Sequence, residues 1–212
     1  LFGLDARGHH ATNVLLHAAN AGLLVAVLAA LTGSPGRSLL AGLLFALHPL
    51  RAESVAWATE RRGVLSGLFF FLTILLYLRA SEREGTPRRW LLATSIACFI
   101  LGLLSKSILM TLPLVLILLD LYPLRRLDPS PRRWWTESSS RVWREKIPYA
   151  AVALAGAMVG YYGQAANSYF TSFVKYPFTA RIGMAFYSLW FYVEKTALPI
   201  GLSPLYELPA EV

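Results

Sequence analysis

Four polar side chains recur at helical spacing near the start of the chain, namely His10, Asn13, His17 and Asn20. Intervals of three and four residues place them on one face of a helix. A polar face is costly in contact with lipid, so this one indicates either a helix interface or an aqueous cavity. Hydrogen bonding between helices is the simpler interpretation for His17 and Asn20, which lie deeper in the apolar run. A ligand pocket is equally supported for His10 and Asn13, and we count His17 with them as a pocket candidate.

A charged segment follows a proline and carries both signs of charge from residue 48 to residue 62. Arginines suit the bidentate recognition of phosphate, and carboxylates can hold a divalent metal or orient a hydroxyl group. The alternative is a salt-bridged helix in the membrane interface, which the helical spacing of Glu53, Trp57 and Glu60 favours. The segment has no metal-ligand spacing, so no metal site is predicted. Its candidate phosphate ligands are Arg51, Arg61 and Arg62, and its candidate pocket residues are His48, Glu53 and Glu60.

Lys106 stands between two apolar runs, in the short link from Ser105 to Ser107. Such a lysine can extend its ammonium group to the membrane interface without any binding role. It can equally contact the phosphate of a lipid headgroup, as a compact charge at the bilayer boundary. The residues alone leave both interpretations open.

Seven apolar stretches must position these residues. The 212-residue chain is 56% hydrophobic and 15% charged, with a mean hydropathy of +0.50, whereas soluble domains carry about 25% charged residues. Several stretches are shorter than the roughly 20 residues of a typical span, but they lack the charged face of soluble helices. Because backbone groups in lipid must be paired internally, we predict an all-α, polytopic membrane bundle of about six or seven membrane helices. The stretches are 13–31, 38–50, 63–78, 90–104, 108–121, 147–162 and 182–202.

The loops between these stretches divide by positive charge. Taken alternately, one set carries 12 Lys and Arg residues and the other carries 6. By the positive-inside rule, the first set faces the cytoplasm and the second faces the periplasm or lumen. The net charge of +8 therefore indicates the lipid bilayer as a partner, not nucleic acid. The cytoplasmic set comprises 33–37, 79–89 and 122–146, and the opposite set comprises 48–62, 105–107 and 164–181.

Other features narrow the function classes. A single cysteine, Cys98, excludes an intrachain disulfide framework. The sequence contains no Walker A loop, GxSxG elbow, HExxH motif or channel filter, so ATPase, serine hydrolase, zinc enzyme and channel interpretations have no support. The chain opens without Met, in polar sequence beside a span, which predicts at least one preceding span and an outer loop.

Several separated motifs agree with one family. They are HATNVLLH at 10–17, HPLRAESVAWATER at 48–61, LSK at 104–106, TLP at 111–113, LLDLYPLR at 118–125, EKIP at 145–148, and LPIGL at 198–202 with Tyr206. In this order they resemble the membrane part of the transmembrane and tetratricopeptide repeat-containing proteins. The resemblance covers nearly the whole chain.

This resemblance implies a GT-C-like fold. GT-C enzymes are multi-span glycosyltransferases, and those related to this family transfer a sugar from a polyprenyl-phosphate carrier to a protein Ser or Thr hydroxyl on the periplasmic or lumenal face. An acidic residue of the first outer loop acts there as base or metal ligand. That loop would precede Leu1, so the catalytic residue is unknown here and a divalent metal stays open. A soluble repeat domain is expected after Val212, and richness in Ala, Leu and Arg suggests a bacterial inner membrane.

Carried over by position, two cations match family residues. Arg61 matches an arginine, although Gly63 stands where related enzymes have Asp. Lys106 matches a lysine, although Ser107 stands where Pro or Gly is usual. The resemblance implies that these cations offset the charge of the carrier phosphate, with Arg51 and Arg62 beside them. The residues expected to shape the acceptor and sugar pocket are His10, Asn13, His17, His48, Glu53, Glu60 and Tyr206.

A second function class stays open. The chain could be a non-catalytic membrane anchor or scaffold for a soluble repeat domain, with its polar residues only joining helices. A lipid-linked sugar transporter is a third interpretation, but no pair of broken, pseudo-symmetric helices supports it.

Overall fold

The computed structural model describes residues 6–167, 177–203 and 206, and within them the regular structure is entirely helical. The α-helices are α1 (Ala6–Thr32), α2 (Pro35–Leu47), α3 (Ala52–Ala56), α4 (Arg61–Ser81), α5 (Gly85–Ser105), α6 (Leu112–Leu121), α7 (Glu137–Ala166) and α8 (Phe178–Ala197). Short 3₁₀ helices are η1 (Pro49–Arg51), η2 (Ala58–Glu60), η3 (Ser107–Thr111) and η4 (Pro131–Arg133). Each of the seven apolar stretches overlaps an α-helix, so the predicted all-α membrane bundle is confirmed.

Three helical segments are long and apolar enough to cross a membrane, namely Ala6–Thr32, Ala58–Ser81 and Gly85–Ser105. A fourth span results if the pair Pro35–Leu47 and Pro49–Ala56, bent by 56°, counts as one. The apolar helix Ser107–Leu121 is shorter than these. The larger number of six or seven membrane helices, and the GT-C-like arrangement, stay predictions.

Local sequence sets the first turns. Gly33 adopts a positive φ of 63°, which costs glycine little, and Pro35 starts α2 at the position where its missing N–H is harmless. Pro49 begins η1 after His48, whose backbone is extended. A tight turn therefore follows Thr32, and α2 ends at Leu47, before Pro49.

The alternative of one interfacial helix through Glu53, Trp57 and Glu60 is wrong. Helix α3 ends at Ala56, and Trp57 is extended with φ −83° and ψ 120°. The physical reason is a side chain from α1: the amide of Asn13 donates to the carbonyl oxygens of Val55 at 3.3 Å and Trp57 at 2.9 Å. Those carbonyls are satisfied across the helix interface, so the segment does not continue as one helix.

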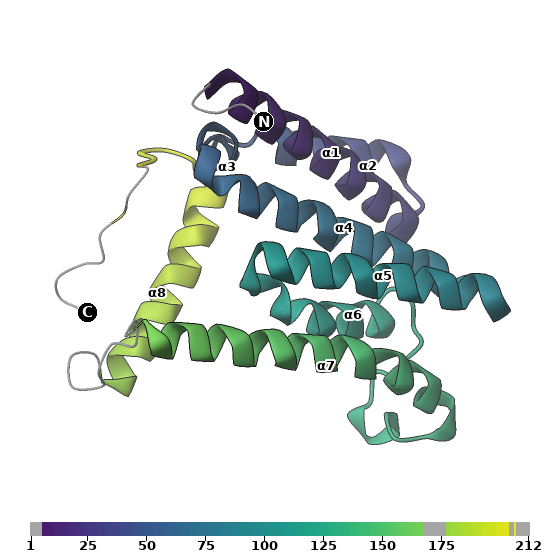
Figure 1. The fold of residues 1–212 in the computed structure, drawn as a ribbon. Helices are drawn as coiled ribbons and strands as arrows, with labels where there is room; N and C mark the ends of the chain where they lie inside the picture. Colours follow the sequence, from purple (N-terminus) through teal and green to yellow (C-terminus); the bar gives the residue numbers. More distant parts are fainter. Residues whose placement is uncertain (1–5, 168–176, 204–205, 207–212) are drawn as a thin grey trace.

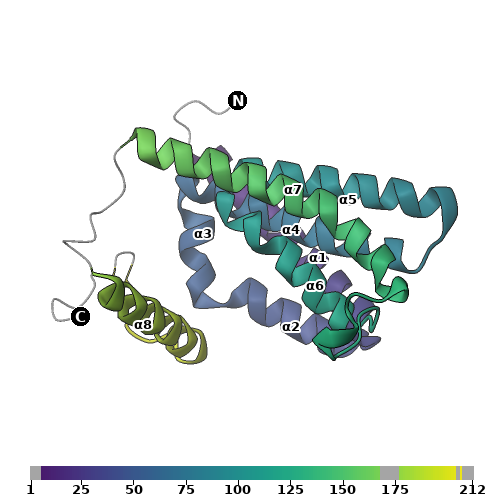
Figure 2. The same ribbon diagram turned by 90° about the horizontal axis from the view of Figure 1, so that it is seen from below.

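The bundle has two ends, and the fully described loops that were predicted to share a side share an end. Of the predicted outer loop 164–181, residues 168–176 lie outside the described residues. We call the end with 48–62 and 105–107 the outer end, and the end with 33–37, 79–89 and 122–136 the inner end. Figure 1 shows α1, α4, α5 and α7 running between these ends, with α2 beside α1 and α8 lying across the outer end. Figure 2 shows α7 and α5 along one edge of the bundle, with α2 along the opposite edge.

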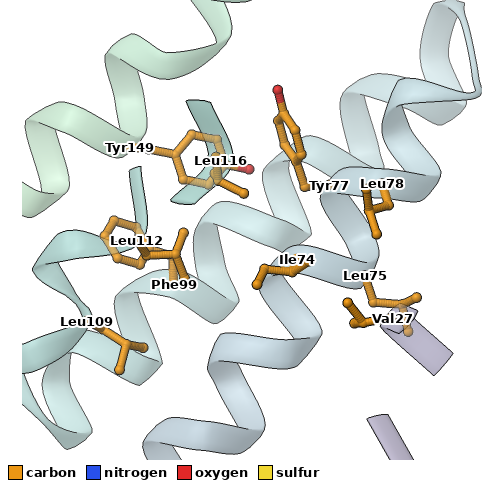
Figure 3. Packing of buried hydrophobic residues seen from close by; sticks show 10 residues of the cluster. All are labelled: Val27, Ile74, Leu75, Tyr77, Leu78, Phe99, Leu109, Leu112, Leu116 and Tyr149. Carbon is orange, nitrogen blue, oxygen red and sulfur yellow. The ribbon is translucent and has the colours of Figure 1, made fainter. Parts of the chain in front are cut away.

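The apolar core lies between α4, α5, α6 and α7. Figure 3 shows Tyr149 of α7 beside Phe99 of α5, whose rings lie 5.9 Å apart. Gly102 allows α5 and η3 to approach closely, since a Cβ there would lie 2.3 Å from Cδ2 of Leu109. The buried cluster comprises Val27, Ile74, Leu75, Tyr77, Leu78, Phe99, Leu109, Leu112, Leu116 and Tyr149. This core fixes the central helices, which in turn carry the polar residues at both ends.

A buried charge cluster closes the inner end. The carboxylate of Asp120 accepts hydrogen bonds from the hydroxyl of Tyr77 at 2.7 Å, from Arg126 at 3.0 Å and from Lys146. Asp120 itself is fully buried. Glu145 extends the cluster by accepting from Arg126 at 2.6 Å. A buried carboxylate needs such partners, so this cluster ties α4 and α6 to the start of α7.

Arg126 stays charged in this setting. Burial alone lowers the pKa of its guanidinium group, but Tyr77, Glu145 and Asp120 together raise it above its ordinary value. Opposite charges nearby favour the ionised form. Asp120, Glu145 and Lys146 of this cluster come from the motifs 118–125 and 145–148, whereas Arg126 directly follows the first motif.

Candidate functional site

The link Ser105 to Ser107 places Lys106 over the start of α4. Its Nζ atom lies 3.1 Å from Oε2 of Glu60, and the two side chains are 44% and 31% exposed. Gly63 makes room for this pair, since a Cβ there would lie 2.8 Å from Oε2 of Glu60 and 3.4 Å from Nζ of Lys106. Glu60, three residues before Gly63, thus supplies the carboxylate beside Lys106.

This ion pair borders a cavity of about 360 Å³ at the outer end. Charged and polar groups come from α1, η1, α3, η2, α4 and the α5 to η3 link, and three phenylalanines supply an apolar wall. The lining consists of His17, Asn20, Phe45, Arg51, Ser54, Glu60, Gly63, Val64, Ser66, Gly67, Phe70, Phe71, Lys106 and Ile108. The arrangement suits a ligand with an anionic group, hydroxyl groups and an apolar part.

Asn20 carries an unused acceptor on this lining. Its Nδ2 atom donates to the carbonyl oxygen of Val64 at 2.8 Å, which joins α1 to α4. Its Oδ1 atom is buried and has no hydrogen-bond partner among the described residues. A buried acceptor without a partner costs free energy, so a ligand that donates to it gains affinity.

Arg61 faces α1 and does not line the cavity. Its Nη2 atom lies 2.7 Å from Nδ1 of His9, and its Nε atom lies 3.5 Å from Oδ1 of Asn13. Asn13 in turn holds the carbonyl oxygens of Val55 and Trp57. Arg61 and Asn13 therefore position the turn that precedes η2 and, with it, Glu60.

The other predicted residues lie at the same end but make separate contacts. His17 contacts the carbonyl oxygen of Ala46 at 3.1 Å, and His48 contacts that of Thr196 at 3.0 Å, so His48 meets α8. Tyr206 packs on the ring of Phe191 with centroids 4.8 Å apart. The remaining predicted residues, which are exposed and outside the cavity lining, are His10, Glu53 and Arg62.

Arg51, one of the predicted phosphate ligands, lies on the cavity lining. Its guanidinium carbon lies 4.7 Å from the centroid of the Phe45 ring, a cation and π contact that orients the side chain. Lys106 and Arg51 are therefore the two cations that face the cavity. Within the described ranges, no group of three or more His, Cys, Asp or Glu side chains is placed to hold a metal ion.

For two residues of the outer end, the sequence did not predict the role that the structure shows. His9 contacts Arg61, whereas the sequence singled out its neighbour His10. Asn20 was assigned to helix contacts, and its amide nitrogen makes one, but the residue also lines the cavity, and its buried oxygen has no hydrogen-bond partner among the described residues. The adjacent pair His9 and His10 was the available sequence signal for this contact. Which of the two histidines meets Arg61 depends on how α1 is rotated about its axis.

Comparison with curated proteins gives several matches. The chain is 46% identical over 83 residues to Protein O-mannosyl-transferase tmtc2 of Xenopus laevis, which covers 39% of this chain. It is 36% identical over 128 residues to TMTC2 of Mus musculus, covering 59% of this chain, and 38% identical over 121 residues to Tmtc2 of Drosophila melanogaster, covering 56%. This chain is a relative of the TMTC proteins. The predicted resemblance to the transmembrane and tetratricopeptide repeat-containing family is thus confirmed.

The matched region is only a small part of each TMTC protein. The chain spans only 10%, 15% and 13% of the lengths of these three relatives. No family profile matches the chain, and no solved structure matches it. The relatives named here are animal proteins, and with the apolar helices they indicate a multi-pass membrane protein. They give no support to the predicted bacterial inner membrane.

Proposed function

We propose that this chain belongs to the membrane region of a protein O-glycosyltransferase and that its outer cavity binds the phosphate of a lipid-linked sugar donor. The protein O-mannosyl-transferase names of the TMTC relatives support glycosyl transfer and favour mannose as the sugar. The observation that carries the proposal is the outer cavity itself, where Lys106 and Arg51 face one hollow at a membrane helix end. Of the two cations, Lys106 lies closer to the anionic partner Glu60, at 3.1 Å.

The lining fits the parts of such a donor. The two cations offset the charge of the carrier phosphate, and the phenylalanine wall formed by Phe45, Phe70 and Phe71 suits the polyprenyl chain or a sugar face. The unpartnered Oδ1 atom of Asn20 accepts a hydrogen bond from a sugar hydroxyl. The outer end then faces the periplasm or lumen, in keeping with the distribution of positive charge over the loops.

The proposed reaction is a substitution at the anomeric carbon of the sugar. A Ser or Thr hydroxyl oxygen of the acceptor protein forms the new bond to that carbon, and the bond from the carbon to the phosphate oxygen breaks. The hydroxyl proton passes to a carboxylate, which we place in a loop preceding Leu1, and the carrier phosphate leaves with the electron pair. Lys106 and Arg51 stabilise the charge that develops on the leaving phosphate, an effect that often dominates enzymic rate gains. A soluble repeat domain after Val212 is part of the proposal.

Sugar transfer by the full-length protein, from a labelled polyprenyl-phosphate mannose, tests this function. Lys106→Ala is expected to lower the transfer rate about tenfold to a hundredfold, since a hydrogen bond to a charged group contributes roughly 1.5–3 kcal/mol. Arg79→Ala is the matched control, because Arg79 is exposed at the inner end of α4, the helix that begins directly after Glu60. The control is expected to keep the full rate.

Two results separate this function from the alternatives. If the protein transfers no sugar but still supports a soluble repeat domain in the membrane, the scaffold interpretation holds. If transfer occurs and Lys106→Ala, Arg51→Ala and Arg79→Ala all keep the full rate, the outer cavity is not the donor site.

A further inference from the structure

A second groove lies at the opposite end of the bundle, between α5 and α7. Its volume is about 520 Å³, and it is separate from the outer cavity in position and lining. Figure 2 shows the two helices side by side along this edge. The groove is lined by Gly85, Arg88, Arg89, Leu92, Ile96, Arg141, Arg144, Glu145, Pro148 and Tyr149.

The mouth of this inner groove is strongly basic. Four arginines and one glutamate give the lining a net charge of +3. Glu145 is already paired with Arg88 and lies 3.7 Å from Nε of Arg141. Arg89 and Arg144 are exposed and have no ion-pair partner among the residues that the structure describes. Two guanidinium groups at the mouth are therefore available to an anion.

The deeper half of the inner groove is apolar. Leu92 and Ile96 follow Arg88 at intervals of four residues, so all three share one face of α5. Pro148 and Tyr149 face them from α7, one turn beyond Glu145. Trp90, which follows Arg89 in the sequence, is 71% exposed, and tryptophan is enriched at membrane interfaces. The groove thus passes from charged to apolar in the direction from headgroups to hydrocarbon.

We propose that the inner groove binds an anionic phospholipid. Its phosphate contacts Arg89 and Arg144, and its acyl chains lie along Leu92 and Ile96. Basic pockets between membrane helices on the cytoplasmic side have this chemistry, and the planar guanidinium group matches phosphate oxygens. A free phosphate ion would use only the arginines, so the apolar half favours the lipid. The inference concerns the end away from the outer cavity and does not depend on sugar transfer.

Native mass spectrometry of the purified protein in neutral detergent tests this site. Phosphatidylglycerol and phosphatidylcholine with the same acyl chains are added in parallel, and inorganic phosphate is added at the same concentration as a third arm. We expect one phosphatidylglycerol to be retained at concentrations where phosphatidylcholine is not. The double variant Arg89→Gln/Arg144→Gln is expected to weaken that binding about thirtyfold, from the typical contribution of a basic residue near an anionic membrane.

A matched control uses two arginines of the inner end outside the groove. Arg79→Gln/Arg132→Gln removes the same charge from exposed positions and is expected to leave the binding unchanged within about twofold. Equal losses in both double variants would overturn the site, because general surface charge would explain them. Equal retention of the two lipids would overturn it, and so would full competition by inorganic phosphate.

Discussion

The hydroxyl group of Tyr77 donates a 2.7 Å hydrogen bond to Oδ2 of Asp120, across 43 positions of the sequence. The same carboxylate also accepts from Arg126 and Lys146, so its two oxygens bring together α4, α6, α7 and the loop between the last two. Charges removed from water are stabilised only while each has its partners. The inner end therefore depends on this one carboxylate.

Asp120→Asn is expected to lower the free energy of unfolding by about 3–5 kcal/mol, the usual cost of leaving a buried charge without its partner. Lys146 and Arg126 would remain at the site with one negative charge fewer. Chemical or thermal unfolding in detergent measures the change. Glu84→Gln is the control, since Glu84 is 89% exposed and lies 3.9 Å from Arg141, and it should cost at most about 1 kcal/mol. Equal costs would show that Asp120 is no more important than a surface carboxylate.

Gly102→Ala is expected to destabilise the bundle by roughly 1–3 kcal/mol, the common cost of overpacking. The new methyl group would lie 2.3 Å from Leu109 and 3.0 Å from the Cβ of Phe69. This steric overlap would push η3 and α4 away from α5. Gly22→Ala provides the matched helical comparison, because nothing lies within 4 Å of a Cβ there. That variant should be neutral or slightly stabilising, and thermal unfolding distinguishes the two. A loss of stability in Gly22→Ala as large as in Gly102→Ala would contradict the packing argument.

The helices of this chain could be predicted because the membrane leaves few choices for an apolar stretch. Backbone groups in lipid must be paired within the segment, so each charge-free stretch forms a helix. Gly33, Pro35 and Pro49 interrupt helical structure and so set the end of α1 and both ends of α2. The grouping of loops into two ends also follows from such alternation. The number of membrane spans is harder to predict from the sequence, since the length and composition of the described helices support only three or four.

The partners of polar residues could not be predicted from spacing. Adjacent residues of a helix point about 100° apart, so His9 meets Arg61 while His10 is exposed. The break at Trp57 depends on Asn13, which lies 44 positions earlier. Such pairings depend on how helices rotate against one another, and periodicity within one helix does not contain that information.

Asn13→Ala is expected to destabilise the outer end by about 1–3 kcal/mol, since the carbonyl oxygens of Val55 and Trp57 lose their donor. Hydrogen exchange of residues 52–60 should accelerate, whereas exchange at the inner end should not change. Asn167→Ala is the control, because Asn167 is exposed directly after α7 and donates a hydrogen bond to the carbonyl oxygen of Gly163. Unchanged exchange of 52–60 in Asn13→Ala would show that the turn at Trp57 holds without this side chain.

Glu60→Gln distinguishes two roles of the carboxylate that lies 3.1 Å from Lys106. If Glu60 competes with the donor phosphate for Lys106, removing its charge should lower the KM for the lipid-linked sugar about fivefold, which corresponds to roughly 1 kcal/mol between charges near 4 Å in water. We expect this result, because both side chains are partly exposed and the pair contributes only about 0–1 kcal/mol to stability.

The matched control for this measurement is Glu194→Gln, an exposed carboxylate on α8 that does not line the outer cavity. It should leave KM unchanged. Thermal unfolding of Glu60→Gln, Lys106→Ala and the double variant should yield a coupling free energy below about 1 kcal/mol. A rise in KM in Glu60→Gln, as large as that in Lys106→Ala, would mean that Glu60 positions the ammonium group. In that case the ion pair, and not the free lysine, is the form that receives the phosphate.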